Sequence, residues 1–278
     1  MRYLVAGLMP AIALLCAPMP VLAKDACTRE SLKAATETYI AAQRSGSPAA
    51  MPLAASVAYV ENMQKAVLSG GILSTPQKID FHRSLLDTQN CETFTEVVIT
   101  DPAHPYVLGT RLKLVDGKVA EIETLVTDSD DWLFKASITY KYASVEDWGV
   151  IPAADRSSRA TLIAAANAYF DLFMDPKTVV PWGSPCARLE GGIYTGKGRP
   201  DDTCNVGVPS GVKIVERRFI VDEDVGGVVG LVVFGQNRLP DSHMFRVERD
   251  KIRYVHTITV CKTFNCGFPV PEQLRTQQ

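Results

Sequence analysis

Two of the four histidines in the chain lie in one short segment near its C-terminal end, residues 241–260. The segment predicts two strands joined by a tight turn at Arg249 and Asp250. Counting outward from this turn places His243 directly opposite His256 on a mostly apolar face, because successive strand side chains alternate between faces. Two facing imidazoles on an apolar surface would not both hold a proton, so one would be free to act as a base. The pair predicts acid–base chemistry, although hydrogen-bonded core histidines would give the same pattern.

Neighbouring charged side chains could complete such a site. Asp241 lies two residues before His243 on the same predicted face and could orient the histidines or balance their charge. In another predicted strand, Arg188 and Glu190 share one face. A carboxylate beside an apolar pocket can act as an acid and an arginine can hold an anionic group; a structural ion pair beside a disulfide is the alternative. We therefore take His243, His256 and Glu190 as the candidate catalytic residues.

The candidate substrate-binding residues are aromatic or polar side chains on the same strands and on strands of the first half. They are Arg188, Trp182, Tyr254, Asp241, His82, Tyr59 and Glu61. His82 stands alone in a mixed strand, a pattern that is also typical of a structural histidine. Two histidines and a carboxylate are the minimal set for a metal, but HxH or HxD spacing is missing, so we expect no metal.

Other chemistries lack their motifs in this sequence. There is no GxSxG elbow, no P-loop, no GxGxxG that opens a helix and no HExxH, so we expect no cofactor and no serine-hydrolase chemistry. Glycoside hydrolysis by a pair of carboxylates stays an alternative, because the distance between two carboxylates cannot be read from the sequence. The 29 basic and 31 acidic residues nearly balance and form no basic cluster. This balance argues against nucleic acid or a membrane as partner and favours a small molecule.

The N-terminal residues 1–23 are typical of a signal peptide. Arg2 supplies a positive charge, residues 4–16 are apolar, and small residues precede Lys24. We expect a mature chain that begins near Lys24 and is secreted to the extracellular space. No later segment has the length and hydrophobicity of a transmembrane helix.

Beyond this leader the cysteines are even in number: Cys27, Cys91, Cys186, Cys204, Cys261 and Cys266. An even set in a secreted chain predicts disulfides, although six cysteines allow 15 connectivities. Sequence proximity favours Cys186 with Cys204 and Cys261 with Cys266, which leaves Cys27 with Cys91. A structural zinc site is the poorer interpretation because no CxxC pair occurs.

The chain contains one structural unit twice. A predicted helix that Thr28 can cap resembles a second helix at about residues 158–173. After each helix, VAYVEN (57–62) resembles CARLEG (186–191), which aligns Glu61 with Glu190, each about 30 residues from the start of the helical match. Each unit reads as a helix followed by a curved, mostly antiparallel sheet, an α+β arrangement. Two such units would pack as an intramolecular pseudo-dimer.

The last hairpins of the two units also align. LKLVDGKVAEIETLV, from Leu112, matches FRVERDKIRYVHTIT, from Phe245. The alignment places Thr110 at the position of His243 and Glu123 at that of His256. We therefore divide the chain into a first unit with its linker (24–150) and a second unit (151–278). The remaining predicted elements are strands at 56–61, 79–86, 93–100, 106–115 and 118–127, an extended connector at 132–142 and a linker at 147–156.

This order of elements resembles the nuclear transport factor two-like (SnoaL-like) cone. Several phrases, among them RSLLDTQNC (83–91), DPAHPYVLGT (101–110), PWGSPCARLEGG (181–192) and CNVGVPSG (204–211), resemble a secreted fungal family of undefined function. Cone proteins of this kind include ketosteroid isomerase, scytalone dehydratase and polyketide cyclases, and also members that only bind ligands. The resemblance implies a deep apolar pocket that works without a cofactor.

Together these observations predict a secreted tandem cone protein, either monomeric or a homodimer. We expect a cofactor-independent isomerase, dehydratase or lyase whose site lies in the second unit, because only that unit has the two histidines. The alternative is a secreted protein that binds a small molecule without converting it.

Overall fold

The computed structural model describes residues 27–269, which form two six-stranded sheets, each covered by one long helix. In the first half, helix α1 (Arg29–Ser45) precedes a sheet with the strand order β2-β1-β6-β5-β4-β3. Its strands are β1 (Leu53–Glu61), β2 (Gln64–Lys65), β3 (Phe81–Asp87), β4 (Glu92–Ile99), β5 (Tyr106–Val115) and β6 (Lys118–Thr127). The β1–β6 pair is parallel and the other pairs are antiparallel.

The second half repeats this plan. Helix α3 (Arg159–Leu172) precedes a sheet with the order β8-β7-β12-β11-β10-β9, in which β7 and β12 form the parallel pair. Its strands are β7 (Trp182–Glu190), β8 (Ile193–Tyr194), β9 (Ile214–Asp222), β10 (Gly227–Phe234), β11 (Leu239–Glu248) and β12 (Lys251–Thr259). The prediction of two tandem α+β units, each a helix on a curved, mostly antiparallel sheet, is confirmed.

The same local signals start and turn both units. Thr28 and Ser158 precede the two helices, and each side chain accepts a hydrogen bond from a backbone N–H three residues later. The turns at 116–117 and 249–250 have positive φ at both residues, which is the geometry of a two-residue hairpin loop. The predicted positions of both helices and of both final hairpin turns are therefore confirmed.

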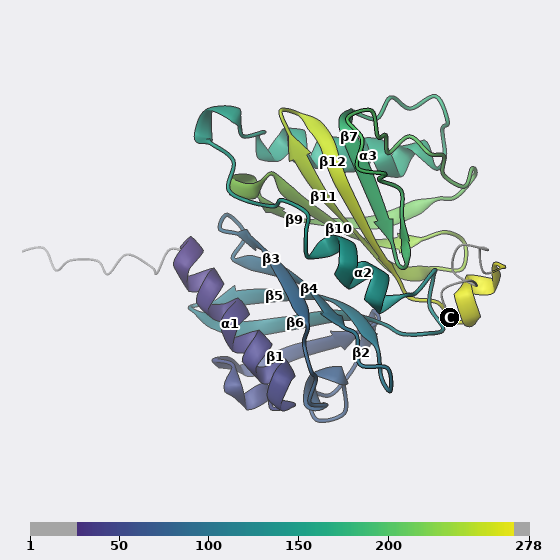
Figure 1. The fold of residues 1–278 in the computed structure, drawn as a ribbon. Coiled ribbons are helices and arrows are strands. Elements are labelled where there is room, and N and C mark those ends of the chain that lie inside the picture. The colour runs from purple at the N-terminus through teal and green to yellow at the C-terminus, as the bar shows by residue number, and fades with distance from the viewer. Residues whose placement is uncertain (1–26, 270–278) are drawn as a thin grey trace, which may run out of the picture.

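The helices cover the outer faces of the sheets, and the two sheets pack against each other through their inner faces (Figure 1). Helix α1 contacts β3 and β4, and α3 contacts β9, β10 and β11. Between the sheets lies an apolar layer that includes Phe94 and Leu125 from the first half and Leu231, Met244 and Ile258 from the second. Each half also has its own core under its helix. A side chain in β11 or β12 therefore points either to α3 or to the other half.

Reciprocal ion pairs join the two halves. Arg29 at the start of α1 lies 2.6 Å from Asp222 of the second half, and Arg159 at the start of α3 lies 2.7 Å from Asp87 of the first. Both aspartates are almost fully buried, and each also accepts a backbone N–H from the opposite half. Equivalent residues exchange contacts, as they do across the two-fold axis of a dimer. This is the pseudo-dimer that the repeat predicts.

The extended connector predicted at residues 132–142 is wrong, because part of it forms helix α2 (Ala136–Ala143). Aromatic residues alternate along this stretch and so imitate a strand. The buried positions of the helix are instead Ala136, Thr139 and Ala143, which follow a helical period. Tyr140 is partly exposed. Helix α2 contacts both sheets and lies where the halves meet (Figure 1).

The three predicted disulfides are confirmed: Cys27–Cys91, Cys186–Cys204 and Cys261–Cys266. The first joins the residues before α1 to the loop between β3 and β4, and the second joins β7 to the loop between β8 and β9. Among residues 27–269, no helix has the length and apolar character needed to cross a membrane. The predicted signal peptide lies outside the described residues.

Candidate acid–base site

A β-bulge at Arg253 changes the register of the hairpin that carries both histidines. Next to the turn, Val247 pairs with Ile252, as the predicted turn requires. One step further, Arg246 pairs with Tyr254, so Arg253 has no partner in β11. Because side chains alternate along a strand, a one-residue shift turns every later residue of β12 to the opposite face.

The predicted pairing of His243 with His256 is therefore wrong. His243 pairs with Thr257, and His256 pairs with Met244. The His243 side chain points toward α3 and the core of the second half, where it contacts Tyr169. The His256 side chain points to the first half. The two-histidine metal site loses its geometric basis, and no three His, Cys, Asp or Glu side chains within residues 27–269 form a metal-binding group.

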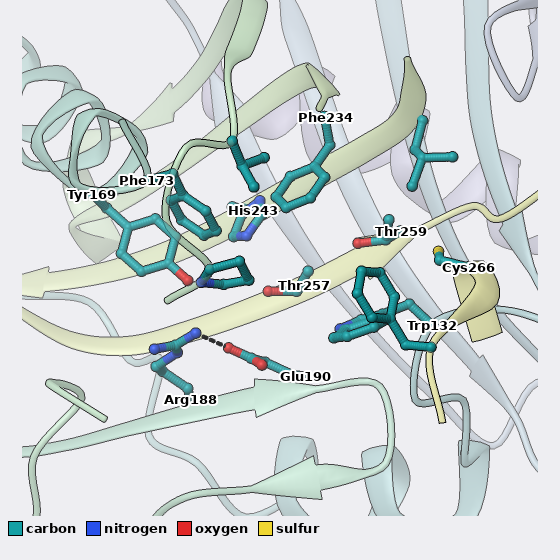
Figure 2. Close-up of a pocket in the computed structure, with 14 residues that line it drawn as sticks. Trp132, Tyr169, Phe173, Arg188, Glu190, Phe234, His243, Thr257, Thr259 and Cys266 are labelled. Carbon is teal, nitrogen blue, oxygen red and sulfur yellow. Dashed lines mark ion pairs between the residues drawn. The ribbon is translucent and has the colours of Figure 1, made fainter. Parts of the chain in front are cut away.

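His243 lines a cavity of about 90 Å³ inside the second half, beneath α3. Figure 2 shows Tyr169, Arg188 and His243 toward one end of this cavity and Trp132 and Cys266 toward the other. The lining residues are Trp132, Tyr169, Phe173, Arg188, Glu190, Pro209, Val212, Phe234, Leu239, His243, Thr257, Thr259, Cys266 and Phe268. The cavity thus has a polar end and a mostly aromatic, apolar remainder, as a site for a small organic molecule requires.

Asp241 lies next to the His243 ring. Its Oδ1 lies 2.7 Å from His243 Nδ1, and its Oδ2 accepts a hydrogen bond of 2.5 Å from the Thr259 hydroxyl. The imidazole is 2 % exposed and lies against the rings of Tyr169 and Phe170, with centroid distances of 5.3 and 5.4 Å. No described residue hydrogen-bonds Nε2, so a ligand can exchange a proton there. The Asp241–His243 contact is a short ion-pair distance without hydrogen-bond alignment, so the carboxylate acts on the ring through its charge and stabilises the imidazolium that forms.

Five buried side-chain atoms at or beside this cavity have no hydrogen-bond partner among residues 27–269. They are the Tyr169 hydroxyl, Arg188 Nε, the Thr257 hydroxyl, and the neighbouring atoms His243 Nδ1 and Asp241 Oδ1. Burial raises the pKa of Tyr169 far above its ordinary value, so its phenol stays protonated and can donate. Unpartnered buried donors are rare and costly in proteins. Their presence together on one cavity is what a site adapted to an acceptor oxygen of a ligand would show.

The Arg188 guanidinium is otherwise held in place. It forms an ion pair with Glu190, donates a hydrogen bond of 2.8 Å to the Gly207 carbonyl, and lies over the Tyr169 ring at 5.5 Å. The structural ion pair predicted as an alternative is therefore present next to the Cys186–Cys204 disulfide. Both side chains nevertheless line the cavity, so the pair also forms part of its wall.

The first half has satisfied groups at the equivalent positions. Tyr39, which corresponds to Tyr169, is hydrogen-bonded to Thr110 at 2.7 Å, and Thr110 is within 3.1 Å of Thr124. Tyr59 stands where the second half has Arg188, and its hydroxyl donates a hydrogen bond to Glu61. Glu61 also accepts the Ile72 N–H at 2.7 Å. Tyr59 and Glu61 are thus brought together and bonded to each other, while partly buried Glu61 also lines a separate pocket of the first half and the C-terminal segment.

His256 lies in a buried cluster that joins the two halves. Its Nδ1 is 3.0 Å from Glu96 and its Nε2 is 2.7 Å from Glu146, while Arg83 lies 3.9 Å from both carboxylates. Burial alone would lower the pKa of His256, but the two carboxylates outweigh it and raise the pKa to about 9. His256 therefore keeps its proton near neutral pH and is not available as a base for the cavity.

The remaining predicted site residues lie outside the cavity wall. Trp182 packs behind Tyr169, with ring centroids 5.6 Å apart. Tyr254 lies on the same face of β12 as His256 and packs against Trp148. His82 is exposed on β3. Partial desolvation of its ring and the positive charge of Arg44 lower its pKa.

Four residues of the cavity wall were not predicted as parts of the site: Tyr169, Thr257, Trp132 and Phe268. Tyr169 aligns with Tyr39 in the repeat, and this was the one available signal. Thr257 required the bulge to be known. Trp132 follows β6 and Phe268 follows β12, and they meet only because the chain folds these two distant segments together.

The comparisons with known proteins name no activity. A family described as "Domain of unknown function (DUF8021)" matches residues 155–259, most of the second half. Among solved structures, the chain is similar to an NTF-2 like protein of unknown function from Burkholderia xenovorans LB400. The two are 14% identical over 36% of this chain and 84% of that chain, with a TM-score of 0.28.

It is also similar to an NTF2-like protein from Bacteroides fragilis NCTC 9343, with 9% identity over 87% of this chain and 100% of that chain and a TM-score of 0.23. No curated protein matches the sequence. The description of the fold therefore comes from the strand order of the two sheets and not from these similarities.

Proposed function

We propose that the second half is a cofactor-independent acid–base enzyme, an isomerase, dehydratase or lyase, that acts on a small apolar carbonyl compound. The observation that carries this proposal is the contrast between the repeats. The hydroxyl of Tyr39 is hydrogen-bonded to Thr110 in a closed core, whereas the hydroxyl of Tyr169 is unpartnered beside His243 and an open cavity. Unsatisfied donors and a buried base next to a carboxylate at the same cavity are parts of an active site rather than of a core.

The charges at the polar end favour a neutral oxygen over a carboxylate. The cation of Arg188 is already balanced by Glu190, and Asp241 adds a further negative charge next to His243. An incoming carboxylate would therefore meet no free cation among the cavity residues that the structure describes. A ketone or aldehyde oxygen can instead accept hydrogen bonds from Tyr169 and from Arg188 Nε–H.

The reaction would begin with His243 Nε2 taking a proton from the carbon next to the carbonyl. The C–H electron pair becomes a carbon–carbon double bond, and the carbonyl π electrons move to the oxygen. Tyr169 and Arg188 donate hydrogen bonds to that oxygen, where negative charge develops. The imidazolium, stabilised by Asp241, then returns the proton to another carbon in an isomerisation. In a dehydration it gives the proton to a leaving hydroxyl, which departs as water.

Proton exchange with a simple ketone tests this proposal. Acetophenone in D₂O should lose its methyl C–H signal faster when the protein is present, as followed by NMR. His243→Gln should reduce the protein-dependent rate by about 100-fold or more, the usual contribution of a positioned base. The matched control is His82→Gln, because His82 lies outside the cavity. Equal exchange in wild type and His243→Gln would refute the assignment of the base.

The same experiment separates catalysis from binding. Saturable binding of acetophenone to the wild type without any exchange would support the alternative, a protein that holds a ligand without converting it. That alternative is favoured by the Arg188–Glu190 pair, since Glu190 is already engaged and is less free to serve as a second acid.

We further propose that the protein acts outside the cell. Three disulfides support an oxidising compartment. The signal-like composition of residues 1–23 supports export.

A further inference from the structure

The end of the cavity away from Tyr169 is formed by one segment that follows β6 and one that follows β12. Trp132 follows β6 of the first half, and Cys266 and Phe268 follow β12. The rings of Trp132 and Phe268 meet edge to face, with centroids 5.2 Å apart and an angle of 82° between their planes. Phe268 is 56% exposed, so this pair forms the part of the cavity wall that also borders solvent. We call Trp132 and Phe268 the aromatic gate.

Hydrogen bonds between the two segments hold the gate. The Asn265 N–H donates to the Asp130 carbonyl at 2.6 Å, and the Leu133 N–H donates to Asn265 Oδ1 at 2.8 Å. The Cys261 N–H donates to Asp131 at 2.5 Å. Asn265 is 2% exposed and also donates to the Phe268 carbonyl. Residues 130–133, which follow β6, therefore position the C-terminal segment 261–268.

Residues 130–133 are themselves held against the connection between β7 and β8. A Cβ on Gly191 would come within 2.6 Å of the carbonyl oxygens of Trp132 and Leu133, so only glycine fits between them. The Gly192 N–H donates to the Leu133 carbonyl at 2.5 Å, and Leu133 has a φ of 49°. A non-glycine residue in this conformation is maintained only when its surroundings determine it, and such residues concentrate at functional sites.

We infer that Trp132 and Phe268 are specificity-determining residues of the cavity, and that they select ligands with a planar aromatic ring next to the carbonyl end. This inference rests on the proposed function only for the location of the ligand. Two aromatic rings at right angles offer one ring face and one ring edge, and a planar ring can satisfy both. Such contacts contribute about 0.5–1.5 kcal/mol beyond the burial of area, so a saturated ring of equal size would bind more weakly.

The test compares the binding of acetophenone with that of cyclohexyl methyl ketone, which has a saturated ring of the same size. We expect wild type to bind acetophenone more tightly than cyclohexyl methyl ketone. Trp132→Ala or Phe268→Ala should reduce this preference, the dissociation constant of the saturated ketone divided by that of acetophenone, by about 2- to 10-fold. The matched control is Phe264→Ala. Phe264 lies in the same C-terminal segment and is also 56% exposed, but it does not line the cavity.

Asn265→Ala provides a second, independent measurement. It leaves both gate rings intact but removes the bond to the Leu133 N–H. We expect faster hydrogen exchange at the Leu133 amide and loss of the same preference between the ketones. An unchanged affinity ratio in the gate variants, or a wild type that binds neither ketone, would overturn the inference. Loss of proton exchange in His243→Gln, with the affinity ratio retained, would affect the proposed chemistry alone.

Discussion

Tyr169 and Tyr39 occupy equivalent positions in the two repeats but have opposite hydrogen-bonding environments. Both are fully buried, and burial raises the pKa of each above its ordinary value. Tyr39 is hydrogen-bonded to Thr110, whereas no residue of the described chain bonds the Tyr169 hydroxyl. A buried hydroxyl without a partner destabilises the folded protein unless a ligand satisfies it. The difference between these two tyrosines is the residue-scale basis of the proposed site.

Replacing each tyrosine by phenylalanine should therefore have different effects. Tyr39→Phe removes a hydrogen bond and should lower the free energy of unfolding by about 1 kcal/mol. Tyr169→Phe removes an unsatisfied group and should leave this free energy unchanged or higher, while weakening the binding of acetophenone. Urea denaturation with and without the ketone measures both effects. An equal loss of stability in the two variants would show that Tyr169 has an unrecognised partner.

At the scale of elements, the hairpin of β11 and β12 shows how far sequence reasoning extends. The turn at 249–250 and its counterpart at 116–117 were predicted correctly, and so were the bounds of β5 and β6. The bulge at Arg253 was not, because nothing in RDKIRYV indicates that one residue is left unpaired. The first half has the same irregularity, since Lys113 pairs with Glu121 but Leu114 with Val119. A feature repeated in both halves belongs to the fold rather than to either sequence.

The candidate site was predictable to the extent that it depends on the alternation of side chains along strands. Alternation selected His243, Arg188 and Glu190, and the structure places all three on one cavity. Counting outward from the hairpin turn gave the wrong role for His256, because the bulge at Arg253 decides which face each residue of β12 occupies. Trp132 could not be assigned from sequence, since its position depends on how the first half packs against β7 and β8.

At the scale of the whole molecule, the cluster around His256 joins the two halves. Glu96 comes from β4, Glu146 from the segment between α2 and α3, Arg83 from β3 and His256 from β12. Tyr254 and Tyr194 of the second half lie near the Glu146 charge. Two cations and two anions are balanced when His256 is protonated. The halves are thus held by a charged contact that depends on one titratable group.

This contact should make stability depend on pH. The pKa of folded His256 is raised from 6.5 to about 9, so its stabilising effect is fully present below pH 6.5 and disappears as the pH rises through 9. The loss of unfolding free energy caused by His256→Gln should shrink by about 3 kcal/mol between pH 6 and pH 10. Urea denaturation of wild type and variant across this range measures it. A difference that does not vary with pH would show that His256 is neutral in the folded protein.

The claim that the site lies in the second half, at His243 alone among the histidines, can be tested in one NMR experiment. The chain has 4 histidines, so selective ¹⁵N labelling gives a small set of ring signals. Titration with acetophenone should move the His243 ring signals and leave those of His82, His104 and His256 in place. Movement of another histidine without that of His243 would contradict the account, as would saturable binding that moves none of them.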